Sequence, residues 1–152
     1  MKVILYKTVE GILSICYPTV SIDDPSGFEE SAALARAATK DIPKDATNIR
    51  IIDRSEVPQD RTFRNAWEDT GTITVNMPLA REIWRDKMRR ARIPKLAALD
   101  VEYMRADEGG DASKKAFIAG KKQSLRDVTS DPAIDSAQTP EELKLVWPSI
   151  LT

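Results

Sequence analysis

The side chains best suited to chemistry in this 152-residue chain are its single cysteine and its adjacent carboxylates. The sequence has no histidine, so the commonest general base at neutral pH and the commonest metal ligand are both missing. Cys16 lies in an expected strand, and without a histidine to activate it we interpret it as a buried, inert thiol. Neither a glycine-rich phosphate loop nor a serine nucleophile elbow occurs, which disfavours nucleophilic catalysis.

Pairs of acidic residues adjoin at Asp23-Asp24, Glu29-Glu30, Asp107-Glu108 and Glu141-Glu142. A hydrolase can use two carboxylates, but these pairs fall in expected loops and helix starts, where solvation and the helix dipole favour acids anyway. The DEGGD segment at 107–111 offers oxygen ligands without the spacing of a calcium-binding EF-hand. We therefore predict a protein that is not an enzyme, with no catalytic residue, no metal site and no cofactor.

Length, charge and cysteine content limit the remaining classes of protein to which this chain could belong. The length suits one domain, or two small lobes that share a core. A net charge of -1 argues against an overall electrostatic grip on nucleic acid. Lys7 and Glu10 interrupt the first apolar run before an export signal could form, and no apolar stretch is long enough to cross a membrane. With one cysteine and no internal disulfide, we expect folding in a reducing cytoplasm.

Residues 1–57 are predicted to form a small α+β lobe. Two short runs rich in branched and aromatic residues, 2–7 and 12–17, predict a hairpin. Residues 28–40 have acids near their start, alanines and leucine inside and a lysine at the end, which predicts a helix. The run at 48–54 predicts a third strand, so the lobe is expected to be β-β-α-β.

Residues 58–77 are predicted as a linker or clasp between this lobe and the rest of the chain. Its DRTFRNAW motif places Phe63 and Trp67 four residues apart, on one side of an expected helical turn. The two rings either form a core plug that joins the lobes, the favoured interpretation, or hold a partner protein.

Residues 78–152 are predicted as a helical hairpin with a short terminal helix. The first helix begins at Pro78, which suits a first helical position, and carries the stripes Trp84–Met88–Ala91 and Leu96–Leu99–Tyr103. Pro94 lies between the stripes, so we predict a kink or short break near residues 90–94.

The second helix of the hairpin is expected over 112–128, after a turn at Gly109-Gly110. Residues 131–138 have the composition of a flexible connection. Thr139, Pro140 and Glu142 then predict a capped terminal helix with a capping box, and Trp147-Pro148 ends it.

The segment from Arg81 to Arg92 is the most basic in the chain, with six basic and two acidic residues around Trp84. Its main arginines recur at steps of four, four and three, at Arg81, Arg85, Arg89 and Arg92. We interpret them as a solvated face with ion pairs beside the apolar stripe. A docking surface for an acidic partner is the second interpretation, and nucleic acid is the least favoured.

Asp100 stands between Leu99 and Val101 in the apolar part of the hairpin. A carboxylate near a core needs a partner. With the turn centred on Gly109-Gly110, Arg126 is the nearest cation, so we predict an Asp100 to Arg126 pair that fixes the hairpin register.

The helical stretch Arg81 to Leu99, LRD at 125–127 and the Trp147-Pro148 ending together resemble tail and tail-fibre assembly chaperones of tailed bacteriophages. The resemblance covers roughly residues 58–150, and the first lobe matches no motif of that family. It implies a helical hairpin that binds the distal, receptor-binding end of a tail fibre and helps its trimer form. The implied location is the host cytoplasm during assembly.

Three function classes follow from these patterns. The first is an assembly chaperone whose partner is a tail fibre or another tail protein, with Phe63, Trp67, Trp84 and Trp147 as the expected partner-binding residues. The second is a virion component, such as a fibre-attached cap, tail-tip or decoration protein, that stays in the particle tail as part of an oligomeric assembly. An enzyme or nucleic-acid regulator is the third and least favoured class.

Overall fold

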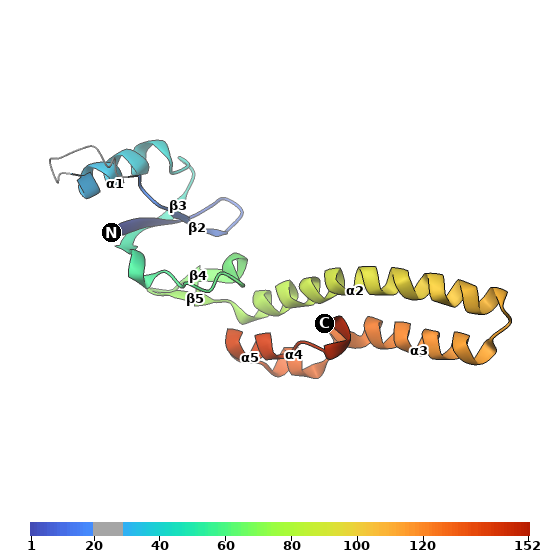
Figure 1. Ribbon diagram of the computed structural model, residues 1–152. Helices are drawn as coiled ribbons and strands as arrows, with labels where there is room; N and C mark the ends of the chain where they lie inside the picture. The colour runs from blue at the N-terminus through green and yellow to red at the C-terminus, as the bar shows by residue number, and fades with distance from the viewer. Residues whose placement is uncertain (20–28) are drawn as a thin grey trace. The chain divides into compact units, whose positions relative to one another are not determined.

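The computed structural model describes residues 1–19 and 29–152, and the chain divides into two compact units, Met1–Asn76 and Met77–Thr152 (Figure 1). The first unit is built on a sheet and the second is helical, which confirms the predicted α+β class with a small N-terminal lobe and a C-terminal helical hairpin. The Asp23-Asp24 pair lies outside the described residues.

The first unit is an antiparallel sheet with one helix. Strands β1 (Lys2–Lys7), β2 (Leu13–Cys16) and β3 (Thr47–Asp53) lie in the order β2-β1-β3, and helix α1 spans Glu29–Lys40. Because side chains alternate along a strand, Val3 and Leu5 enter one core cluster while Ile4, between them, packs with Leu34 of α1 on the other face. The predicted β-β-α-β order is confirmed, with β1 buried on both faces.

Residues 58–77 are predicted as a linker or clasp, and all of them except Met77 fold as part of the first unit. Strands β4 (Trp67–Asp69) and β5 (Ile73–Val75) form a hairpin of their own. Trp67 packs into the cluster of Val3 and Leu5, and Arg50 of β3 forms an ion pair with Asp69 at 2.6 Å. Ile73 and Val75 of β5 pack against the same cluster, so apolar packing and the Arg50 contacts together attach this hairpin to the main sheet.

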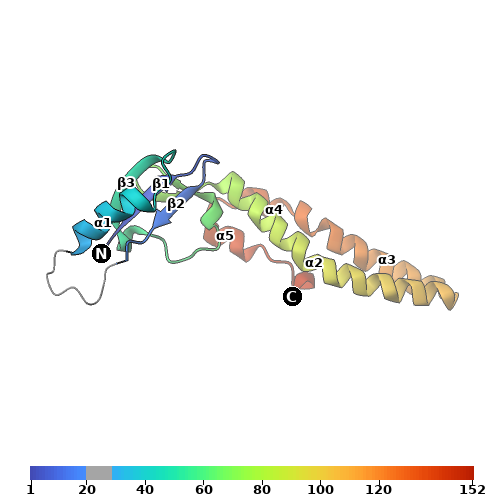
Figure 2. The same cartoon turned by 90° about the horizontal axis from the view of Figure 1, so that it is seen from above.

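The second unit is dominated by two antiparallel helices, α2 (Met77–Glu108) and α3 (Ala112–Asp127), which lie side by side in both views (Figures 1 and 2). The turn between them is where the sequence predicted it. Gly110 has a φ of +69°, in the left-handed region that glycine adopts without strain, and the Asp111 side chain caps α3 by accepting from the Lys114 N–H at 2.9 Å.

Of the predicted kink or short break near residues 90–94, the break is wrong, because α2 runs through Pro94 as one helix, and the kink stays a prediction. Proline has no N–H to offer the Arg90 carbonyl, but both residues are exposed, so water can satisfy that oxygen. The stripe formed by Trp84 and Met88 therefore continues in the same element to Leu99.

The chain returns along α2 in four short helical segments: η3 (Val128–Ser130), α4 (Pro132–Ser136), α5 (Pro140–Leu145) and η4 (Ser149–Leu151). The predicted flexible connection at 131–138 is wrong, because Asp131 caps α4 and Ile134 is fully buried. The Thr139 cap of α5 is confirmed, whereas the Glu142 carboxylate accepts from the Gln138 N–H one residue before the cap.

Among the helices in the described part of the chain, none combines the length and apolar character needed to cross a bilayer.

Substituting Ile134 tests whether α4 belongs to the core. Ile134→Ala should lower the free energy of unfolding by about 2–5 kcal/mol, the usual cost of a cavity left by a large buried aliphatic side chain. Urea denaturation followed by circular dichroism measures the change. Leu145→Ala is the control, because that side chain is 84% exposed. Equal, small effects of the two substitutions would mean that residues 131–138 are not packed.

Candidate functional site

The Trp147-Pro148 ending closes onto α2. The rings of Trp84 and Trp147 meet edge to face with centroids 5.3 Å apart, and the Trp84 Nε1–H donates to the Val146 carbonyl at 2.8 Å. The Lys87 ammonium lies 4.5 Å from the Trp84 ring and 5.5 Å from the Trp147 ring. Trp84 is 4% exposed, so it serves the core, whereas Trp147 is half-buried. Partner binding by either ring stays a prediction.

Phe63 and Trp67 do not share a helical turn. Phe63 precedes the 3₁₀ helix η2 (Arg64–Ala66), and Trp67 begins β4 with an extended backbone, ψ 140°. Both side chains are buried, and Trp67 lies in the sheet core of the first unit. Burial is the state expected of the core interpretation, and the partner-binding interpretation of these two rings stays a prediction.

The arginines of α2 act on the returning chain. Arg92 donates to the Arg126 carbonyl at 2.8 Å, and Arg85 donates to the Thr129 carbonyl at 3.3 Å. Arg85 also pairs with the Asp135 carboxylate at 2.5 Å, and its Nη1 reaches Glu82 at 2.6 Å. The contacts of Arg85 with Asp135 and Glu82 raise the pKa of its guanidinium, chiefly through the Asp135 hydrogen bond.

Arg81 completes this set by donating to the Ala137 carbonyl at 2.8 Å. The three acceptors, Arg126, Thr129 and Ala137, lie at the ends of α3, η3 and α4, where helix carbonyls lack intrahelical partners. We call Arg81, Arg85 and Arg92 the arginine clamp. The predicted ion pairs are present at Arg85 and Arg89, but the predicted solvated face needs correction, because three of the four arginines donate to carbonyls at helix ends.

Asp100 pairs with Lys122 instead of Arg126. Asp107 pairs with Lys115 in the same way, seven residues later on α2 and seven earlier on α3. The two pairs therefore report one register, in which Lys122 stands opposite Asp100 and Arg126 lies a turn beyond it. The Asp100 carboxylate is also 57% exposed, so it is not the core charge that the sequence suggested.

Tyr103 lies between these two ion pairs. The ammonium groups of Lys115 and Lys122 are 5.5 Å and 5.2 Å from its ring centroid. Contacts of a cation with an aromatic face add to the Coulomb attraction, so these charges and one ring help to hold this part of the α2–α3 hairpin together. This cluster could not be predicted from the sequence, because a contact between a cation and a ring depends on the register of the two helices.

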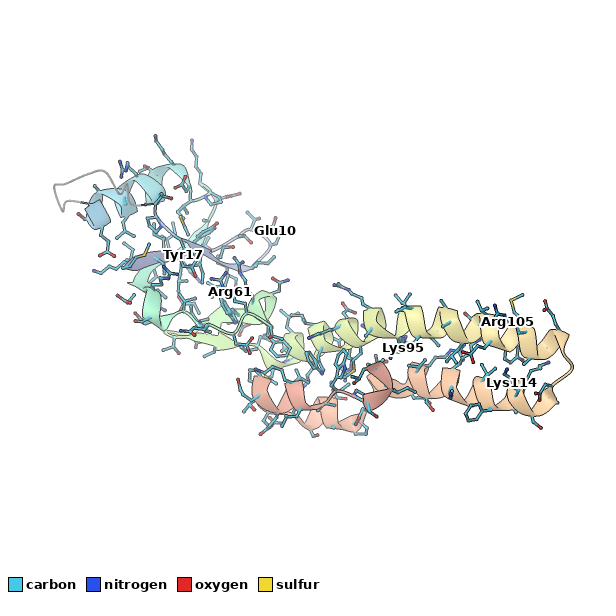
Figure 3. All side chains as sticks on the ribbon, viewed as in Figure 1. Glu10, Tyr17, Arg61, Lys95, Arg105 and Lys114 are labelled. Atoms are coloured by element: carbon cyan, nitrogen blue, oxygen red, sulfur yellow. The ribbon has the colours of Figure 1, made fainter. Side chains whose placement is uncertain are left out.

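An apolar groove of about 300 Å³ lies on the hairpin. Its lining residues come from α2, α3 and η4, and they are Lys95, Ala98, Leu99, Lys121, Leu125 and Ile150. Lys95, labelled in Figure 3, donates to the Thr152 carbonyl at 2.8 Å, and the Lys121 ammonium lies 4.6 Å from the Phe117 ring. The groove thus has an aliphatic floor and a cationic rim, a combination suited to a peptide with apolar and acidic side chains.

The first unit holds a larger and more polar cavity, of about 570 Å³, beside Tyr17 and Arg61 (Figure 3). The guanidiniums of Arg54 and Arg61 lie 5.7 Å and 5.8 Å from the Tyr17 ring centroid, and Arg61 donates to the Tyr17 hydroxyl at 3.0 Å. Neither guanidinium has an ion-pair partner among the residues that the structure describes. The sequence did not indicate this cavity, because its lining residues are far apart along the chain, at Met1, Tyr17 and residues 54–61.

Cys16 lies half-buried in β2. Burial raises the pKa of its thiol, and the nearby Asp41 charge raises it further. Both effects lower the thiolate fraction, the opposite of what a nucleophile needs. Within residues 1–19 and 29–152, no group of three or more Cys, Asp or Glu side chains is placed to hold a metal ion.

Removing one member of the arginine clamp should loosen the helical unit. Arg92→Ala should lower the free energy of unfolding by about 1–3 kcal/mol, since it removes a charged donor from the α3 terminus. Arg89→Ala is the matched control, because among the described residues Arg89 pairs only with exposed Asp86 on the same helix. Urea unfolding of both variants measures the change in the free energy of unfolding. An equal loss of stability in the two variants would contradict a specific role for the arginine clamp.

The thiol of Cys16 should react slowly. At pH 8 its modification by dithionitrobenzoate should be slower than that of free cysteine, because the raised pKa leaves less thiolate, and the rate should rise with pH. Unfolding in urea should remove the difference. A native rate equal to or above that of free cysteine would show an activated thiol.

Comparisons with models of protein families, with curated proteins and with solved structures found no match.

Proposed function

We propose that this chain is a non-enzymatic protein of a bacteriophage tail module, a tail-fibre assembly chaperone that binds the distal end of the fibre through its helical unit. The observation that carries the proposal is the apolar groove with its cationic rim. A chaperone of this kind covers apolar surface on a fibre chain until the trimer forms, and it acts in the host cytoplasm.

The cationic rim and aliphatic floor of the groove suit a partner segment that combines aliphatic and acidic side chains. Lys121 is exposed at the rim, while Leu99 and Leu125 form the floor. Apolar burial supplies most of the affinity at such a site, and the rim charge selects the partner. The arginine clamp also supports the proposal, because a groove built from three segments needs its walls held in place before the partner arrives.

A retained virion component is the second candidate. It is favoured by one observation: α2 has exposed apolar residues outside the groove, Ile93, Val101 and Met104, which would suit lasting contacts in a particle tail. Mass spectrometry of purified particles separates the two candidates. Stoichiometric amounts of the chain would support the virion component and contradict a chaperone that leaves.

Blocking the groove tests the chaperone proposal. Ala98→Arg places a long cation in the groove from an exposed helical position, and it should reduce capture of the co-expressed neighbouring fibre protein at least about tenfold, roughly 1.4 kcal/mol. Ala116→Arg, on the exposed side of α3 outside the groove, is the matched control and should leave capture unchanged.

The fibre itself provides the second readout. Its solubility and trimer yield should fall when the chain is omitted, and they should fall similarly with Ala98→Arg. Unchanged solubility and trimerisation of the fibre without this chain would end the chaperone proposal.

A further inference from the structure

One side of α2 has an apolar stripe that stays open to solvent. We call Ile93, Ala97, Val101 and Met104 the α2 stripe; they follow one another at steps of four, four and three, which places them on one side of the helix. Ile93, Val101 and Met104 are 62%, 50% and 63% exposed. By the same periodicity, the groove residues Lys95 and Leu99 lie on nearly the opposite side of α2. The stripe is therefore separate from the proposed fibre-binding groove.

The α2 stripe is flanked by a basic residue at its N-terminal end and by an acidic residue at its C-terminal end. Arg90 lies three residues before Ile93, and Glu108 lies four residues after Met104, so both continue the same side of the helix. Both residues are exposed, and neither has an ion-pair partner in the described part of the chain.

Charges along the whole of α2 are divided in the same way as at the two ends of the stripe, basic in the N-terminal half and acidic in the C-terminal half. Residues 81–95 contain seven basic and two acidic side chains, whereas residues 96–108 contain four acidic and one basic. A second α2 laid antiparallel would therefore bring the basic half of each helix against the acidic half of the other.

We infer that the α2 stripe is the interface between two copies of this chain, which pair antiparallel along α2 about a twofold axis that crosses the stripe between Ala97 and Val101. In that arrangement Arg90 stands opposite Glu108 of the second copy, and Ile93 stands opposite its Met104. Ala97 opposite Val101 gives a small side chain at the crossing, where the helix backbones approach most closely. The three pairings agree on one register to within one residue, and each occurs twice because the interface is isologous.

Other arrangements of the same stripe are disfavoured by charge. In a parallel dimer or trimer, every Arg90 would stand beside another Arg90 and every Glu108 beside another Glu108. Like charges at such short range oppose association. The antiparallel pair is the arrangement that turns both unpaired charges into ion pairs.

The area of the stripe determines how strongly two copies are expected to associate. A side of α2 from Arg90 to Glu108 is about 27 Å long at 1.5 Å per residue and about 10 Å wide, so two copies bury roughly 500 Å² in total. Interfaces below about 1,200 Å² are typically weak and transient. The dimer should therefore be weak and transient, and it should form only toward the upper end of the concentration range tested.

Sedimentation equilibrium of the full chain over about 1–500 µM tests the inference. The 17.0 kDa protomer should associate to a dimer. Arg90→Glu and Glu108→Arg should each weaken the association at least about tenfold, and the double variant should recover most of the loss by restoring the pairs in reverse. Arg126→Glu, the same charge change at an exposed site on α3, should have no effect.

Orientation has its own readout. In a Cys16→Ser background, mixing Ile93→Cys with Met104→Cys should give a crosslinked heterodimer on oxidation, because these positions face each other only in the antiparallel pair. A monomer at every concentration would overturn the inference, and so would failure of the double charge variant to recover. Crosslinking of Ile93→Cys mainly to itself would overturn the antiparallel arrangement. None of these outcomes bears on fibre capture, so the dimer and the proposed function fail separately.

Discussion

Three arginine side chains on α2 hold the second unit together by donating to backbone carbonyls at the ends of the segments that return along it. A helix end leaves its last carbonyls without intrahelical partners and carries partial negative charge, so a guanidinium there satisfies both needs. The segments after α3 are too short to be stable alone. The Trp84–Trp147 contact, the burial of Ile134 and the walls of the groove all depend on these segments lying against α2.

The sequence predicted those parts of the fold whose signals are local. The first hairpin, α1, β3, the Gly110 turn and the Thr139 cap follow from patterns within a few residues, and the structure confirms each of them. The remaining elements depend on distant contacts. Strands β4 and β5 have three residues each and are attached by Trp67 and the Arg50–Asp69 pair, and α4 is fixed by the burial of Ile134 and by Arg85. Short polar segments of this kind look like loops until their tertiary partners are known.

The candidate site was harder to predict than the fold, for the same reason. Aromatic residues suggest binding surfaces in a sequence, but Trp67 and Trp84 are buried in the structure, and the apolar residues that line the groove are aliphatic. The register of two helices decides which charges meet, so Lys122 and not Arg126 pairs with Asp100.

With the groove on one side of α2 and the apolar stripe nearly opposite, one helix has room for a partner protein and for a second copy at once. Both roles require that α2 and the returning chain behave as a single preformed body.

Native-state hydrogen exchange of the wild-type chain tests that requirement most directly. The amides of Ile134, Ala137 and Leu143 donate within the returning segments, to Asp131, Ala133 and Thr139. If the arginine clamp makes one cooperative unit, these amides should be protected to a degree similar to the amides of Trp84 and Met88 in α2. Exchange of residues 131–146 at the rate of an unstructured peptide, while α2 remains protected, would contradict the account.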